Sequence, residues 1–205
     1  MNTRWKGFTK AAGAGVLLIF VSLLMACATE EEIQARQRAD AQKAIEEARL
    51  QWEQTYPQYD WEGFFSTRVT GNSVRIADYT GTSTVLRIPP QIQGRTVTSI
   101  GDSAFSSKRL TNVTIPNSVT SIGSSAFASN PQLSSVTIGN GIGALNENVF
   151  TGSLRNLSRI SIGVNVNLRG SSDVVWRGFS SAYRANGNRA GVYTLTDGRW
   201  NFQPR

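Results

Sequence analysis

A strand-like triplet returns along the middle of this chain at nearly constant spacing. It occurs four times, beginning at Leu86, Val113, Val136 and Ile160, at intervals of 27, 23 and 24 residues. Other apolar residues keep the same step: Ile100, Ile122 and Leu145; Phe105, Phe127 and Phe150; Leu110, Leu133 and Leu157. A period in the low twenties with fixed apolar offsets is typical of a solenoid, whose coils bury their apolar faces against each other.

The side of each residue follows from alternation along the strands. In Val113-Thr114-Ile115 the two apolar residues should face the core and Thr114 should face outward. Pro116 cannot donate to a strand ladder and should end the strand, whereas Gly123 should permit a tight bend at the next corner. We also expect the three phenylalanines of the repeat to stack as an internal column: Phe105, Phe127 and Phe150.

The pattern V-T-I-P-x-S-V-T-S-I-G-x-x-A-F, complete at residues 113–127 and partial at 96–105, resembles the BspA-type bacterial leucine-rich repeat. The resemblance covers about residues 74–168. It implies a β-rich leucine-rich-repeat solenoid, a short right-handed coil of about four repeats at residues 85–168. The extra length of the first copy, Gln91 to Arg95, has loop composition.

Residues 1–26 should form an export signal, because a basic start precedes an apolar run that is short for a membrane span. Leu24-Met25-Ala26-Cys27 resembles the lipobox of bacterial lipoproteins, which implies that Cys27 becomes a lipidated amino terminus. The alternative is a lone cysteine after an ordinary signal peptide, or a buried thiol. Because Ala28 rather than Asp follows Cys27, the resemblance favours the outer membrane.

Residues 27–57 should form a helical spacer, because the segment is rich in strong helix formers. Thr29 and Glu32 fit a capping box, and Pro57 ends the pattern. The apolar stripe is thin. A solvated spacer, a weak coiled-coil seam and a contact of Trp52 with the first coil therefore all remain open.

Both ends of the solenoid should be closed by caps. Residues 58–84 predict short strands with tight turns, and their cap aromatics are Trp61, Phe64 and Phe65. Residues 169–205 predict a helix and a β-hairpin, whose two-residue turn is Asp197-Gly198. The aromatic residues of this second cap should pack into the core: Trp176, Phe179, Tyr183, Tyr193, Trp200 and Phe202.

The composition argues against an enzyme. One cysteine and no histidine exclude an intrachain disulfide, histidine zinc sites and Ser-His or Cys-His nucleophiles. Asp102 and Glu147 fall near the same corner of different coils but, as we count the repeats, not at matching offsets, so the sequence predicts no paired carboxylates. We expect no catalytic residues, no cofactor and no metal.

The folded part is basic, with fourteen Arg or Lys and seven acids in residues 57–205. The arginines are scattered and no nucleic-acid-binding motif accompanies them, so we expect no nucleic acid partner. The candidate binding residues lie on the outward strand face: Arg87, Thr114, Thr137 and Ser161. Small polar groups on a flat face suit an extended macromolecule, although the hydroxyls can equally well serve only to solvate the sheet.

We therefore expect a lipid-anchored outer-membrane protein whose repeat domain is an adhesin or protein-binding module. The family resemblance implies surface exposure and a protein partner from host extracellular matrix or from another bacterial surface. The alternative is a periplasm-facing lipoprotein that scaffolds other envelope proteins. The sequence itself indicates an anchor, a spacer and a repeated surface.

Overall fold

A computed structural model describes residues 29–55, 59–60, 62–170 and 172–204. The chain divides into two units, residues 1–51 and 52–205, which are considered separately. The predicted signal peptide, Cys27 and Trp61 lie outside the described residues. Among those that are described, no helix combines the length and the apolar character needed to cross a bilayer.

The predicted spacer helix is present as α2, Glu30–Thr55. Its capping box is confirmed: the Thr29 N–H donates to Glu32 Oε2 at 3.0 Å, and the Glu32 N–H donates to Thr29 Oγ1 at 3.3 Å. None of its residues is buried. This exposure fits a solvated spacer, and the coiled-coil alternative stays a prediction.

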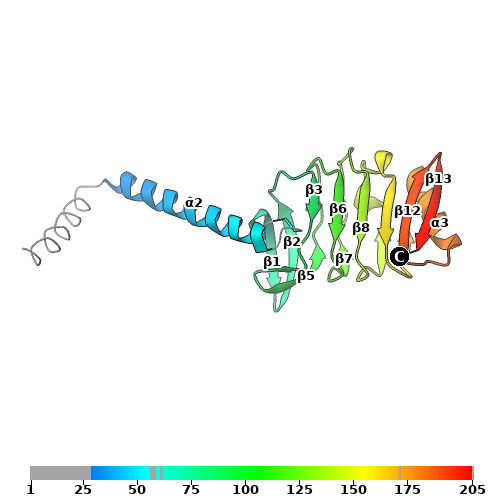
Figure 1. Cartoon of the computed structure of the whole chain (residues 1–205), viewed down its shortest axis with the longest axis horizontal. Coiled ribbons are helices and arrows are strands. Elements are labelled where there is room, and N and C mark those ends of the chain that lie inside the picture. The colour runs from blue at the N-terminus through cyan, green and yellow to red at the C-terminus, as the bar shows by residue number, and fades with distance from the viewer. Residues whose placement is uncertain (1–28, 56–58, 61, 171, 205) are drawn as a thin grey trace, which may run out of the picture. The chain divides into compact units, whose positions relative to one another are not determined.

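The second unit, residues 52–205, is called the repeat unit below. It contains a six-stranded sheet in the order β13-β12-β10-β8-β6-β3 (Figure 1). Its parallel strands carry the four predicted triplets: β3 (Val85–Arg87), β6 (Asn112–Ile115), β8 (Ser135–Ile138) and β10 (Arg159–Ile162). The predicted C-terminal hairpin forms β12 (Gly191–Thr196) and β13 (Arg199–Pro204), and β12 pairs antiparallel with β10. The hairpin thus extends the sheet as well as capping the coil.

A second ladder runs along another side of the same coils. One sheet contains β1 (Phe65–Thr70), β2 (Ser73–Tyr79), β4 (Gln91–Ile92), β5 (Arg95–Ile100) and β7 (Ser121–Ile122). A separate pair contains β9 (Ala144–Asn146) and β11 (Asn167–Arg169). Because β2 pairs in parallel with β5, the N-terminal segment that we expected to be a cap also supplies the first strand of this ladder.

The expected loop at Gln91 to Arg95 is instead a tight β-hairpin between β4 and β5. Its two turn residues, Gln93 and Gly94, have φ values of 51° and 71°, which match the right-handed twist of the flanking strands. Ile92 is buried, so the insert contributes to the core. The composition of this segment did not predict a hairpin, because Ile92 is its single apolar residue.

The phenylalanine column is confirmed. The ring centroids of Phe105 and Phe127 lie 5.1 Å apart, and those of Phe127 and Phe150 lie 5.9 Å apart, with nearly parallel planes. Aromatic residues of the caps continue it, with Tyr79 5.6 Å from Phe105 and Trp176 6.1 Å from Phe150. One aromatic core therefore runs from the first coil to the last.

The helical lid predicted near the C-terminus is α3, Val174–Ala185. Asp173 caps it by accepting the backbone N–H groups of Val175 and Trp176 at 2.8 and 3.0 Å. Short 3-10 segments complete the coils: η1 (Glu62–Phe64), η2 (Glu147–Phe150) and η3 (Leu154–Asn156). Buried aromatic side chains of α3 close the end of the core.

The glycine at the coil corner has a different role from the expected one. Gly123 does not adopt a left-handed φ, so it is not needed for a bend. A Cβ added to it would lie 2.6 Å from the Asp102 backbone nitrogen and 2.7 Å from the Gly101 carbonyl carbon. Glycine is required there because successive coils approach each other too closely for a side chain.

Candidate binding surface

The outward face of the six-stranded sheet brings the four predicted binding residues together. Strand register places Arg87 opposite Thr114, Thr114 opposite Thr137, and Thr137 opposite Ser161. The two hairpin strands then extend this row through Val192 and Gln203. Neighbouring side chains in the row are separated by about 4.8 Å, the distance between paired strands.

A second row, which was not predicted from the sequence, lies two residues away from the first along each strand, on the same face. It consists of Val85, Asn112, Ser135, Arg159, Thr194 and Asn201, again in register. The sequence contained the information needed to predict this row, since residues i and i+2 of a strand share a face. Together the two rows carry hydroxyls, amides and two guanidinium groups, and no carboxylate.

Exposure varies along the first row. Arg87 is exposed, and Thr114 and Thr137 are half-buried. Ser161 is only 4% exposed, so the expectation that it presents an open hydroxyl is wrong. Its strand lies between two others, and the larger side chains of Thr137 and Val192 stand beside it on the same face.

The Arg87 end of the row is fixed by Asp60. The Asp60 N–H donates to the Arg87 carbonyl at 2.9 Å, and Asp60 Oδ2 accepts the Arg87 N–H. The Tyr79 hydroxyl donates to Asp60 Oδ1 at 3.0 Å. Burial raises the pKa of the Asp60 carboxyl and, together with the charge of Asp60, raises the pKa of Tyr79.

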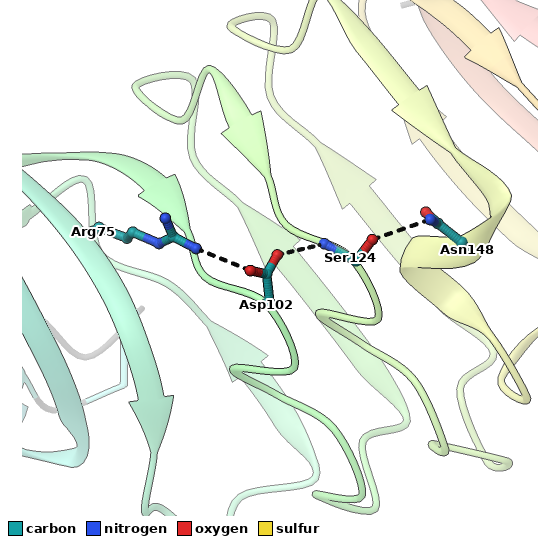
Figure 2. Close-up of polar contacts among 4 residues, drawn as sticks. All are labelled: Arg75, Asp102, Ser124 and Asn148. Carbon is teal, nitrogen blue, oxygen red and sulfur yellow. Dashed lines mark hydrogen bonds and ion pairs between the residues drawn. The ribbon is translucent and has the colours of Figure 1, made fainter.

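Carboxylates at the second ladder act on the backbone of neighbouring coils (Figure 2). Asp102 Oδ1 accepts the Ser124 N–H at 2.8 Å, and Asp102 Oδ2 lies 3.5 Å from Arg75 Nη2. The Ser124 hydroxyl in turn accepts a hydrogen bond from Asn148 Nδ2 at 3.2 Å. These four side chains link successive coils along one corner.

The expected offset mismatch between Asp102 and Glu147 is wrong. Each stands three residues before a phenylalanine of the column, so the two occupy equivalent positions two coils apart. Glu147 accepts the N–H groups of Ser172 and Asp173, both at 3.2 Å. The carboxylates therefore hold different neighbouring segments and do not converge on a reaction centre.

No cluster of three or more metal-binding side chains occurs within residues 29–55, 59–60, 62–170 and 172–204. Stacked coils, parallel strands on two sides and an internal phenylalanine column define the class of the folded unit, a leucine-rich-repeat solenoid of about four turns. Residues 90–172 match the model of the BspA type leucine rich repeat region in six copies, so this part of the chain is a BspA-type leucine-rich-repeat region.

Solved structures of bacterial leucine-rich-repeat proteins are similar to this chain. A leucine-rich-repeat protein of T. pallidum is 25% identical, with a TM-score of 0.48, and the match covers 53% of each chain. One from Bacteroides ovatus is 23% identical, with a TM-score of 0.42, over 51% of this chain and 32% of that one. A leucine-rich cell surface protein of Faecalibacterium prausnitzii is 21% identical, with a TM-score of 0.37, over 54% of this chain and 39% of that one.

This chain thus spans about half the length of the T. pallidum protein and less of the other two. The search of curated proteins returned no match.

Proposed function

We propose that this chain is a lipid-anchored outer-membrane protein whose repeat unit binds a protein partner at the cell surface. The observation that carries the proposal is the outward face of the six-stranded sheet, where two rows of polar side chains stand in register. Leucine-rich-repeat regions typically serve as protein-interaction modules, which supports the same interpretation.

The chemistry of the face favours an extended polypeptide. Threonine, serine and asparagine side chains both donate and accept hydrogen bonds, and they recur at the strand spacing. Arg87 and Arg159 add exposed positive charge at two points, and no acid on the two rows neutralises them. A partner that lies across several strands can therefore meet each strand with one polar contact.

Substitutions on this face test the binding role. Replacing both Thr114 and Thr137 with Glu adds bulk and charge at the centre of the first row, whereas Thr70→Glu adds one charge on the exposed hairpin strand β1. We expect the double variant of the full chain to lose binding to immobilised extracellular-matrix proteins, at low and at physiological salt. Unchanged binding by the double variant, or equal loss in Thr70→Glu, contradicts the proposed face.

The anchor and the orientation need separate experiments in cells. Cys27→Ser should release the protein from the membrane fraction, because the acyl chains attach at that residue in the proposed lipoprotein. Protease treatment of intact cells should remove the repeat unit without lysis. Full protection from protease supports the periplasm-facing scaffold instead, and membrane retention of the Cys27→Ser protein excludes the lipid anchor.

A further inference from the structure

The second ladder of residues 52–205 is interrupted between the coil that contains β7 and the next coil, which contains β9. β5 pairs with β7 through Ser99 and Ser121, and β9 pairs with β11 through Leu145 and Leu168. Within the described residues, β7 and β9 are not paired with each other. The side-chain bond from Asn148 to Ser124 crosses the same junction (Figure 2).

The residue type at one strand position changes at the interruption. The residue after the apolar strand position is Gly101 in one coil and Gly123 in the next, and it becomes Asn146 in the third. At Gly101 a Cβ would lie 2.8 Å from the Ile76 carbonyl oxygen, and at Gly123 it would meet the backbone of Asp102. Asn146 carries a Cβ, but so does Arg169 at the same position of the next coil, and Arg169 is paired with Asn146, so the change from glycine accompanies the separation without being a sufficient cause.

A pocket of about 250 Å³ lies where the strands separate. Its polar lining includes Ser124, Asn146, Asn148 and Arg169, and its apolar lining includes Ile122 and Leu145. At about 30 Å³ per water molecule in the liquid, this volume corresponds to roughly eight waters. A short side chain with an aliphatic stem and a polar end fits such a space.

The polar groups of the pocket favour a negatively charged ligand. Arg169 is exposed and forms no ion pair with any carboxylate among the described residues. Asn146 Oδ1 already accepts the Asn148 N–H at 3.2 Å, which leaves the Asn146 amide group as a donor. The Ser124 hydroxyl accepts from Asn148 and keeps its own hydrogen to donate.

The nearest acids are already engaged. Asp102 binds the Ser124 N–H and Arg75, and Glu147 binds Ser172 and Asp173. Neither carboxylate forms an ion pair with Arg169. Ser124, Asn146 and Arg169 line the pocket and can all donate hydrogen bonds, and a guanidinium group can bind a carboxylate with two parallel hydrogen bonds.

We propose that this pocket binds a glutamate side chain of the protein partner, with its carboxylate on Arg169 and its methylenes against Ile122 and Leu145. The inference rests on the proposed function, because it assumes a polypeptide partner. It names a second contact on the repeat unit, outside the six-stranded sheet. It also names the chemistry of the partner, an exposed acidic segment.

Peptide titration of the full-length ¹⁵N-labelled protein tests the pocket. The probes are acetyl-Gly-Glu-Gly-amide and its Gln counterpart, which differ in charge and hardly in shape. We expect the Glu peptide to shift the signals of Leu145, Asn146 and Asn148, and the Gln peptide to leave them in place. Arg169→Gln should weaken the Glu response about ten-fold or more, because a charge-assisted bond is lost.

Arg177→Gln is the matched control, because it removes one exposed positive charge from α3 outside the pocket. Its response should equal that of the unaltered protein. The proposed site is contradicted if the Gln peptide shifts the signals as much as the Glu peptide does, or if Arg177→Gln weakens the Glu-peptide response as much as Arg169→Gln does. It is also contradicted if the Glu peptide shifts no signals around Asn146.

The outcomes for the pocket and for the sheet face can be separated. If Arg169→Gln leaves the peptide response intact while the Thr114 and Thr137 variant loses the matrix protein, the pocket fails and the proposed function stands. If the peptide response depends on Arg169 while substitutions on the sheet face change nothing, the proposed face fails and the pocket stands.

Discussion

The six-stranded sheet and the second ladder are built from the same coils, yet they differ in continuity. In the six-stranded sheet each strand from β3 to β13 pairs with the next. The second ladder pairs through β7, stops, and resumes at β9. Both keep an apolar residue at each coil, although Ile122 of β7, next to the interruption, is only partly buried whereas Ile100, Leu145 and Leu168 are buried.

Glycine occupies several, but not all, of the points where successive coils approach each other. On the six-stranded side, Gly139 and Gly163 follow β8 and β10, and a Cβ on Gly139 would lie 2.5 Å from the Pro116 carbonyl carbon. On the other side the glycine series ends at Gly123, and Asn146 takes the next position. Glycine is not needed at every step, because Pro116 follows Ile115 of β6 and Arg169 follows Leu168 of β11, and both strands pair with the preceding coil.

The largest expected effect comes from the column that both sheets share. Phe127→Ala removes a fully buried ring that stacks on Phe105 and on Phe150. We expect the free energy of unfolding to fall by about 3 to 5 kcal/mol, measured by chemical denaturation. A loss below about 1 kcal/mol is inconsistent with a continuous column.

A side chain at position 123 tests whether the pairing of β5 with β7 depends on the close approach at this glycine. Gly123→Asn should separate β5 from β7 and break the bonds from Thr120 N to the Thr98 carbonyl and from Gly123 N to the Ile100 carbonyl, at 2.8 and 2.9 Å. The expected cost is about 2 kcal/mol, at about 1 kcal/mol per hydrogen bond. Faster amide exchange at Thr120 and at position 123 is the local measurement.

Gly143→Ala is the control for that substitution. Gly143 has no heavy atom within 4 Å of the position of an added Cβ and does not need a left-handed φ. We expect its stability to stay within about 1 kcal/mol of the unaltered protein. A large loss of stability in Gly143→Ala, or no loss of stability in Gly123→Asn, contradicts the explanation based on close approach.

The reverse substitution, Asn146→Gly, should bring β9 toward β7. The gain of strand pairing is offset by loss of the Asn146 cap on η2, so stability should change by about 1 kcal/mol or less. Amide protection in residues 144–146 should nevertheless rise, and the Glu-peptide response should disappear with the pocket. If amide exchange and the peptide response are both unchanged in Asn146→Gly, then Asn146 does not contribute to the interruption.

The smallest effect concerns pH at the Arg87 end of the continuous sheet. The pKa of Asp60 is raised above its ordinary value of 3.8, so the folded state holds the proton more tightly than the unfolded state does. Stability should therefore decrease as pH rises from about 4 through the raised pKa. Melting temperatures of the unaltered protein and of Asp60→Asn from about pH 3 to about pH 6 should show this loss only in the former.

The sequence predicted features that follow from periodicity. The strand triplets, the phenylalanine column, the α2 capping box and the hairpin at Asp197-Gly198 were all found from residue spacing. The burial of Ser161 was not predictable in this way, because it depends on where the distant β12 docks. The interruption between β7 and β9 was missed because the apolar period continues through it and does not give the distance between coils.

The antiparallel hairpin at the end of the six-stranded sheet has a consequence for how such a chain changes in size. Because β12 reverses direction beside β10, another parallel coil cannot be appended beyond it. A duplication of one coil, such as residues 113–135, can instead be accommodated between existing coils, with both ends left as they are. Each duplication would lengthen the sheet by about 4.8 Å and add one threonine to the outward row. The length of the outward face can therefore change by one strand spacing at a time.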